Sequence, residues 1–199
     1  MVKTPFACLY LHGFLSSPLS KKAQQLSAYF KQHYSSALLS IPALAFEPNV
    51  AIQQAQEALA ELKQHTDKII IIGSSLGGFY ATYLSATHHC KAALINPAVR
   101  PFDLFEHYLG PNKHFYTDEV HELTMEHIEQ LKALDTPCIN APEQLFLLLQ
   151  TGDETLDYKQ AAKLYQACPS WLEGAGNHSF EGFIERLPMI LAWAKCEAF

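Results

Sequence analysis

Short apolar runs alternate along the chain with longer segments in which apolar residues recur every three or four positions. The apolar runs predict strands over residues 6–11, 37–41, 68–72, 91–96, 144–150 and 170–173. The helical periodicity predicts helices over residues 20–33, 49–65, 75–87, 157–167 and 179–195. This alternation is typical of parallel β-α-β units, so we predict an α/β fold with a mostly parallel sheet covered by helices on both faces. The isoleucine run within residues 68–72 indicates a central strand that is buried on both sides.

Residues 100–141 do not follow this pattern. They contain several prolines and a glycine, and their apolar spacing is irregular. About forty residues therefore connect two predicted strands, where a few residues would suffice. We predict an insertion of short helices that lies over the carboxyl ends of the strands, where open parallel sheets bind ligands. The chain would then be a single domain, residues 1–199, and the insertion would form a lid.

Composition excludes some classes of function. The net charge of −6 provides no basic stripe for nucleic acid. No segment approaches the roughly 20 apolar residues of a membrane span, and the N-terminus lacks the apolar region of a signal peptide. The five cysteines are scattered and odd in number, which indicates reduced thiols and a cytoplasmic protein. Composition does not reveal the oligomeric state.

The sequence GSSLG, residues 73–77, follows the isoleucine strand and opens a predicted helix. It matches G-x-S-x-G, in which a tight strand-to-helix turn exposes a serine above the sheet and the flanking glycines prevent clashes. Ser75 is therefore the candidate nucleophile. The alternative is a tight turn whose glycines serve only packing. A phosphate-binding loop fits less well, because the lysine of that motif is missing.

A serine nucleophile needs a base to accept its proton and an acid to orient that base. His178 lies in the loop GAGNH before the last predicted helix and is the candidate base. Asp153, directly after a buried strand, is the preferred acid, with Asp157 second and Glu154 third. Asp157 has a structural alternative as a helix N-cap, with Gln160 as its capping-box partner.

Acyl transfer also needs hydrogen-bond donors for the oxyanion. The backbone N–H of Leu76 follows the nucleophile, and the N–H of Phe14 lies in the loop after the first strand. Gly13 lets that backbone approach the site closely. For His12 we prefer a hydrogen bond to neighbouring backbone over a direct catalytic role.

The insertion carries four histidines, and two of their intervals are seven residues. Side chains seven residues apart on one helix are separated by about 10 Å, too far to share a metal ion. We therefore predict neither a metal nor a cofactor.

Several stretches together make the sequence similar to the α/β-hydrolase superfamily, and within it to the small bacterial YqiA-like esterases. They are YLHGFLSSP, GSSLGGFYATYL, INPAVRPF, LLLQTGDETLDY and GAGNHSFEGF, spread over nearly the whole chain. The resemblance implies an α/β-hydrolase fold and activity on short acyl esters or thioesters. It places the nucleophile, acid and base at Ser75, Asp153 and His178. Asn96 and Pro97 would lie beside the site as its wall, and we count them with His12 and Gly13 as substrate-binding residues.

The leading hypothesis is a serine esterase that acts on a small-molecule acyl ester through an acyl-enzyme. Thioesterase or acyltransferase action would use the same residues. The rival from another class is a binding protein that keeps the fold without the chemistry, although such a protein would usually lack one of the three partners. A serine peptidase is less expected, because no charged motif is evident to anchor a peptide terminus.

Overall fold

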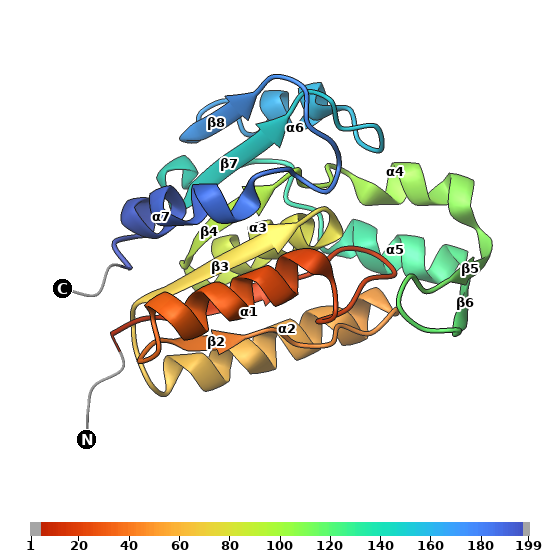
Figure 1. The fold of residues 1–199 in the computed structure, drawn as a ribbon. Coiled ribbons are helices and arrows are strands. Elements are labelled where there is room, and N and C mark those ends of the chain that lie inside the picture. Colours follow the sequence, from red (N-terminus) through yellow and green to blue (C-terminus); the bar gives the residue numbers. More distant parts are fainter. Residues whose placement is uncertain (1–4, 197–199) are drawn as a thin grey trace.

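Six parallel strands form the central sheet of the computed structural model, which describes residues 5–196 (Figure 1). They are β1 (Ala7–Leu11), β2 (Leu38–Ser40), β3 (Ile69–Ser74), β4 (Lys91–Ile95), β7 (Leu145–Gln150) and β8 (Ser170–Glu173). Their order in the sheet is β2-β1-β3-β4-β7-β8, and every neighbouring pair is parallel. All six strands match predicted ones. The isoleucines of β3 are buried, as the prediction of a central strand requires.

Helices cover both faces of this sheet (Figure 1). One face carries α1 (Lys21–His33) and α7 (Phe183–Ala194), and the other carries α2 (Pro48–Lys63), α3 (Leu76–His88) and α6 (Tyr158–Leu164). Side chains alternate along β3, so Ile70 and Ile72 pack with the first pair while Ile69 and Ile71 pack with the other helices. Each face of the sheet therefore has its own hydrophobic core.

The insertion contains a β-hairpin that the sequence pattern did not predict. It comprises α4 (Pro101–Phe105), the 3₁₀ turn η1 (Glu106–Tyr108), the antiparallel strands β5 (Gly110–Lys113) and β6 (Val120–Leu123), and α5 (Met125–Ala133). A further 3₁₀ turn, η2 (Pro142–Gln144), leads into β7. The β5 sequence GPNK has no strand propensity. The hairpin is instead held by tertiary contacts, because Phe115 N–H and His114 Nε2 contact the Leu15 and Ser16 carbonyls, both at 3.0 Å.

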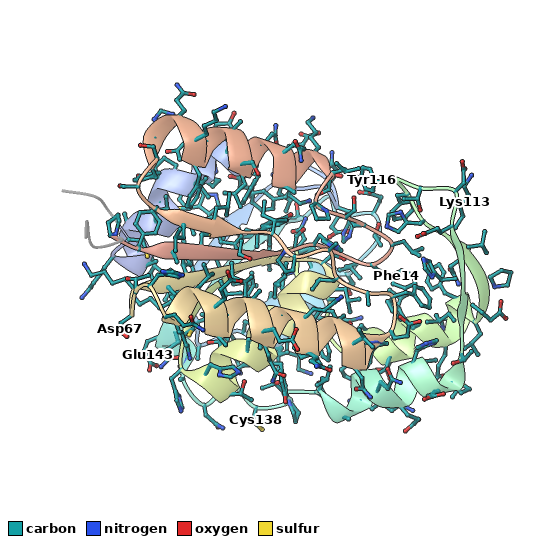
Figure 2. The ribbon with its side chains drawn as sticks, turned by 90° about the horizontal axis from the view of Figure 1, so that it is seen from below. Phe14, Asp67, Lys113, Tyr116, Cys138 and Glu143 are labelled. Carbon is teal, nitrogen blue, oxygen red and sulfur yellow. The ribbon has the colours of Figure 1, made fainter. Side chains whose placement is uncertain are left out.

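The insertion lies at the end of the sheet to which the strand arrows point (Figure 1). Figure 2 shows the same arrangement from below: Phe14, from the loop after β1, lies at the same end of the molecule as Lys113 and Tyr116 of the insertion, whereas Asp67 lies at the opposite end. The carboxyl ends of the strands and the insertion therefore face one another. Among residues 5–196, no helix has the length and apolar character needed to cross a membrane.

Candidate active site

Ser75 stands on a strained turn between β3 and α3. Its backbone has φ 57° and ψ −122°, a conformation that residues other than glycine rarely adopt. The turn is held by neighbouring backbone, because the Ser75 N–H donates to the Ile95 carbonyl at 3.1 Å and the Ser75 carbonyl accepts from the Ala98 N–H at 3.0 Å. This is the geometry of the strand-to-helix elbow that GSSLG predicts.

The two glycines of the pattern are required by close backbone contacts. A Cβ on Gly73 would lie 2.2 Å from the Gly77 carbonyl oxygen, and one on Gly77 would lie 2.1 Å from the Leu11 carbonyl oxygen. Gly78 is confined in the same way by Pro97, whose Cβ would be 2.7 Å away. The glycines therefore serve this elbow and its contact with the end of β1.

The histidine and the acid chosen from the sequence lie beside Ser75. His178 Nε2 is 3.0 Å from Ser75 Oγ, and His178 Nδ1 is 2.9 Å from Asp153 Oδ2 and 3.0 Å from Oδ1. Only 2% of the Asp153 side chain is exposed, against 23% for His178. With a proton on Nδ1 donated to the carboxylate, Nε2 is left to accept the proton of the serine hydroxyl.

The environment of Asp153 keeps its carboxylate ionised. Burial by itself would raise the pKa, but hydrogen bonds from His178 and from the backbone N–H groups of Leu156 and Thr155 outweigh it, so the pKa of Asp153 lies below its usual value. The two backbone bonds are 2.8 and 2.9 Å long, and both go to Oδ1. The carboxylate is therefore fixed in place independently of the imidazole.

The other two acids considered from the sequence have separate contacts. Asp157 caps α6, since its side chain accepts from the Lys159 N–H at 3.0 Å, so the N-cap interpretation is confirmed. The capping box is not formed: among residues 5–196 the Gln160 side chain makes no bond to Asp157, and only its backbone N–H donates to the Asp157 carbonyl, at 3.0 Å. Glu154 accepts from the His178 backbone N–H at 2.9 Å, a contact that the sequence did not indicate. Thus Glu154 holds the loop of His178, while Asp153 meets its ring.

Two backbone donors lie next to Ser75 without protein acceptors. Among residues 5–196, neither the Phe14 N–H nor the Leu76 N–H donates a hydrogen bond to the chain. The loop that carries Phe14 approaches the serine closely, because a Cβ on Gly13 would lie 3.2 Å from Ser75 Cβ and 3.6 Å from its Oγ. Both N–H groups are therefore free to donate to a group bound next to Ser75.

His12 is a buried structural histidine. The Leu44 N–H donates to its Nε2 at 3.1 Å, so Nδ1 carries the proton and donates to the Gly13 carbonyl at 3.1 Å. Burial lowers the pKa of this imidazole, which favours the same neutral form. His12 lines a smaller cavity of about 280 Å³ and is not among the residues that line the cavity at Ser75. Counting His12 with the substrate-binding residues therefore needs correction, and only Gly13 of that pair lines the cavity at the serine.

Asn96 and Pro97 also differ from the expectation of a substrate-binding wall. Neither lines the cavity that contains Ser75 and His178. Asn96 is 2% exposed, and its carboxamide bonds to the backbone at the end of β7 and in the loop before His178. Pro97 packs against Gly78 and borders a separate cavity. Their side chains are turned into the protein because the chain after β4 folds back over the elbow.

A cavity of about 870 Å³ opens on Ser75 and His178. The insertion provides part of its wall through Leu104, Phe105, Tyr108, Phe115 and Tyr116, and α1 contributes Lys21 and Lys22. Four more aromatic residues of the lining come from outside the insertion: Tyr10, Phe14, Phe180 and Phe183. Within the described part of the chain, no three histidine, cysteine, aspartate or glutamate side chains come together as a group able to hold a metal ion.

Comparison with known proteins identifies the family. Residues 7–195 match the sequence pattern of UPF0227, described as an uncharacterised protein family. The chain belongs to the UPF0227 family. A UPF0227 protein of Shewanella woodyi is 29% identical over 197 residues, which cover 94% of this chain and 98% of that protein.

Solved structures share the fold of this UPF0227 chain. It is similar to alpha/beta hydrolase domain-containing protein 10 from mouse, with a TM-score of 0.64 and 14% identity over 94% of this chain and 87% of the mouse chain. It is also similar to the esterase domain of a Rhodothermus marinus protein, with a TM-score of 0.64 and 14% identity over 98% and 87% of the two chains. The fold is therefore that of the α/β hydrolases, as the sequence resemblance implied.

Proposed function

We propose that this UPF0227 chain is a serine hydrolase that cleaves carboxylic esters. The observation that carries the proposal is the unbroken series of contacts from Ser75 Oγ through the His178 imidazole to Asp153, with each step at 2.9–3.0 Å. A fold alone does not imply an activity. What supports it here is that the strained serine, the imidazole bonded to it, and the residues Phe14 and Leu76, whose N–H groups have no backbone acceptor among residues 5–196, all line one cavity.

The proposed reaction proceeds through an acyl-enzyme. Ser75 Oγ attacks the ester carbonyl carbon while His178 Nε2 takes the hydroxyl proton, and the oxyanion accepts from Phe14 and Leu76 N–H. The C–O bond to the alcohol then breaks, and the imidazolium returns its proton to the leaving oxygen. Water attacks the acyl-enzyme with the same imidazole as base, which releases the acid and restores Ser75.

The cavity favours a substrate with a sizeable apolar group. Its volume of about 870 Å³ exceeds what a short acyl chain alone would fill, and the insertion contributes four aromatic residues to its wall, Phe105, Tyr108, Phe115 and Tyr116. We therefore propose that a short acyl group lies near Ser75 and that an apolar alcohol portion occupies the wall formed by the insertion. In this arrangement the insertion acts as a lid that shapes the substrate site.

The same residues would act on thioesters, because a thiolate leaving group needs less help from the imidazolium. A panel of matched oxygen esters and thioesters with one acyl chain separates these substrates. The rival hypothesis, a binding protein without chemistry, predicts that neither class is turned over.

The first test is labelling with a fluorophosphonate, followed by peptide mass mapping of the adduct. This probe reacts with a serine only when a base activates it, so the adduct is expected on Ser75. Ser75→Ala should abolish it, and His178→Ala should slow its formation about 10²- to 10⁴-fold. The matched control is Ser74→Ala, which alters the neighbouring hydroxyl and should leave the adduct on Ser75.

Two outcomes would contradict the proposal. Folded protein that forms no adduct and hydrolyses neither esters nor thioesters would favour the binding hypothesis. An adduct on a serine other than Ser75 would show that the elbow does not carry the nucleophile.

A further inference from the structure

The segment of residues 95–98, from the last residue of β4 onward, contacts both the Ser75 backbone and the loop of His178. Its Ile95 carbonyl and Ala98 N–H hold the backbone of Ser75 on either side, at 3.1 and 3.0 Å. Between them, Asn96 extends its carboxamide toward the loop of His178. One four-residue segment therefore connects two parts of the site that are 103 residues apart in sequence.

The carboxamide of Asn96 uses its hydrogen-bonding groups on three backbone partners. Nδ2 donates to the Asn177 carbonyl at 3.0 Å and to the His178 carbonyl at 3.3 Å, and Oδ1 accepts from the Gln150 N–H at 3.0 Å. Exchanging the two ends of the amide would set oxygen against two carbonyls, so these contacts determine its orientation. The side chain thereby ties the end of β7 to the base-carrying loop.

The backbone of Asn96 is itself in an uncommon conformation. Its φ is 40°, in the left-handed region that asparagine tolerates better than most residues. Its side chain is almost wholly buried, so a lost hydrogen bond there could not be replaced freely by water. Asparagine at this place therefore meets two demands at once, a left-handed backbone and a donor for two carbonyls.

Other side chains also hold the loop around His178 by hydrogen bonds to its backbone. Gln150 Oε1 accepts from the Asn177 and Glu181 N–H groups, at 3.2 and 2.9 Å. Lys22 Nζ donates to the Ser179 carbonyl at 2.7 Å. These partners hold the loop at several points. Within residues 5–196, none of them bonds to the backbone around Ser75, whereas Asn96 belongs to the segment that bonds to Ser75 on both sides.

We propose that Asn96 is a positioning residue that sets His178 Nε2 at bonding distance from Ser75 Oγ. Asn96 faces away from the cavity and touches no reacting atom, so it acts through the histidine loop. This role rests on the proposed function, since it assumes that the distance between serine and imidazole limits the reaction. Removing the link should let the loop relax, and a displacement of about 1 Å at a reacting group typically costs on the order of 10²-fold in rate.

The test compares Asn96→Asp, Asn96→Gly and the control Ser85→Ala. Asn96→Asp keeps the shape and the acceptor for Gln150 but places an oxygen against two carbonyls. Asn96→Gly accepts the left-handed backbone without strain and removes the side chain, so it carries the test if the aspartate variant does not fold. Ser85→Ala removes a buried side-chain bond of 2.7 Å to the Cys90 carbonyl, remote from the site.

The readouts are kcat and KM on a chromogenic ester, the rate of fluorophosphonate labelling, and the downfield proton resonance of His178 Nδ1–H. Both Asn96 variants should lose about 10- to 100-fold in kcat and in labelling rate per folded molecule, with KM nearly unchanged. The Nδ1–H resonance should shift or broaden. Ser85→Ala should lower the unfolding midpoint while all three site readouts stay at wild-type values.

Wild-type kcat and labelling in the folded Asn96 variants would overturn the positioning role while leaving the proposed function intact. The positioning role would also be overturned if Ser85→Ala lost as much kcat as an Asn96 variant with the same unfolding midpoint. If wild-type protein is not labelled at all, the proposed function fails instead. The Nδ1–H resonance still tests whether Asn96 positions the His178 imidazole. An unchanged signal in Asn96→Asp would show that it does not.

Discussion

Replacing Gly77 with alanine tests the contact between the nucleophile elbow and the end of β1. The new Cβ would lie 2.1 Å from the Leu11 carbonyl oxygen, 2.6 Å from its carbonyl carbon and 2.7 Å from the His12 carbonyl oxygen. These are backbone atoms that cannot rotate away. To bring the closest contact to 3.0 Å, the two segments must separate by about 1 Å in a close-packed interior.

That separation would displace both the nucleophile and a proposed oxyanion donor. Gly77 lies two residues after Ser75, and Leu11 lies three residues before Phe14, whose N–H is a proposed oxyanion donor. We expect Gly77→Ala to lower the free energy of unfolding by about 1–3 kcal/mol, as overpacked sites do. We expect kcat/KM to fall about 10²-fold, since the serine and the oxyanion donor would no longer keep their relative positions.

Urea unfolding and hydrolysis of a chromogenic ester, measured on the same preparation, check both effects. The control is Gly174→Ala, because no heavy atom lies within 4 Å of a Cβ at that position. It should change the free energy of unfolding by less than about 0.5 kcal/mol and leave the rate unaltered. If Gly77→Ala behaves like Gly174→Ala in both assays, the close approach does not constrain the elbow and the argument fails.

Three further predictions concern the acids near the site. Asp153→Asn should lower kcat about 10³- to 10⁴-fold in steady-state assays, because an amide can donate to Nδ1 and stabilise the tautomer that cannot accept the serine proton; a loss below 10-fold would contradict the orienting role. Asp157→Ala should lower the free energy of unfolding by about 1 kcal/mol with kcat unchanged, since it removes a helix cap only; a large loss of kcat would assign this residue to the site. The lowered pKa of Asp153 also predicts a pH effect: its contribution to stability is complete above the ordinary carboxyl pKa of about 4 and is lost as pH falls through the lower folded-state value. Urea titrations of wild type and Asp153→Asn at pH 3–6 should therefore converge toward the acid end, and parallel curves would refute the linkage.

The hairpin in the insertion shows where sequence patterns stop being informative. GPNK has neither alternating hydrophobicity nor β-branched residues, yet it forms β5. Part of what holds it lies nearly one hundred residues earlier, at the carbonyls of Leu15 and Ser16. Prolines and irregular apolar spacing located the insertion. The hairpin within it depends on contacts between residues far apart in the sequence, which a pattern of neighbouring residues does not reveal.

Asn96 and His12 illustrate the same limit within the site. Both stand at the ends of apolar runs, and a polar residue that closes a buried strand signals a place near the carboxyl edge of the sheet. That signal does not say where the side chain points. The Asn96 carboxamide turned into the protein, and His12 turned away from the serine toward Leu44.

By itself the sequence determined the six strands of the central sheet, the order of the α/β units and the elbow at Ser75. These follow from hydrophobic periodicity and from the steric demands of a few consecutive residues, which act over short stretches of chain. The sequence ranked Asp153 before Asp157 as the acid, but only the tertiary structure placed Asp153 against His178 Nδ1 and left Asp157 as the cap of α6. The tertiary structure also decided that Asn96 joins the elbow to the histidine loop. Such choices depend on hydrogen bonds across 25 to 103 residues, and only the packing of helices on the sheet brings those partners together.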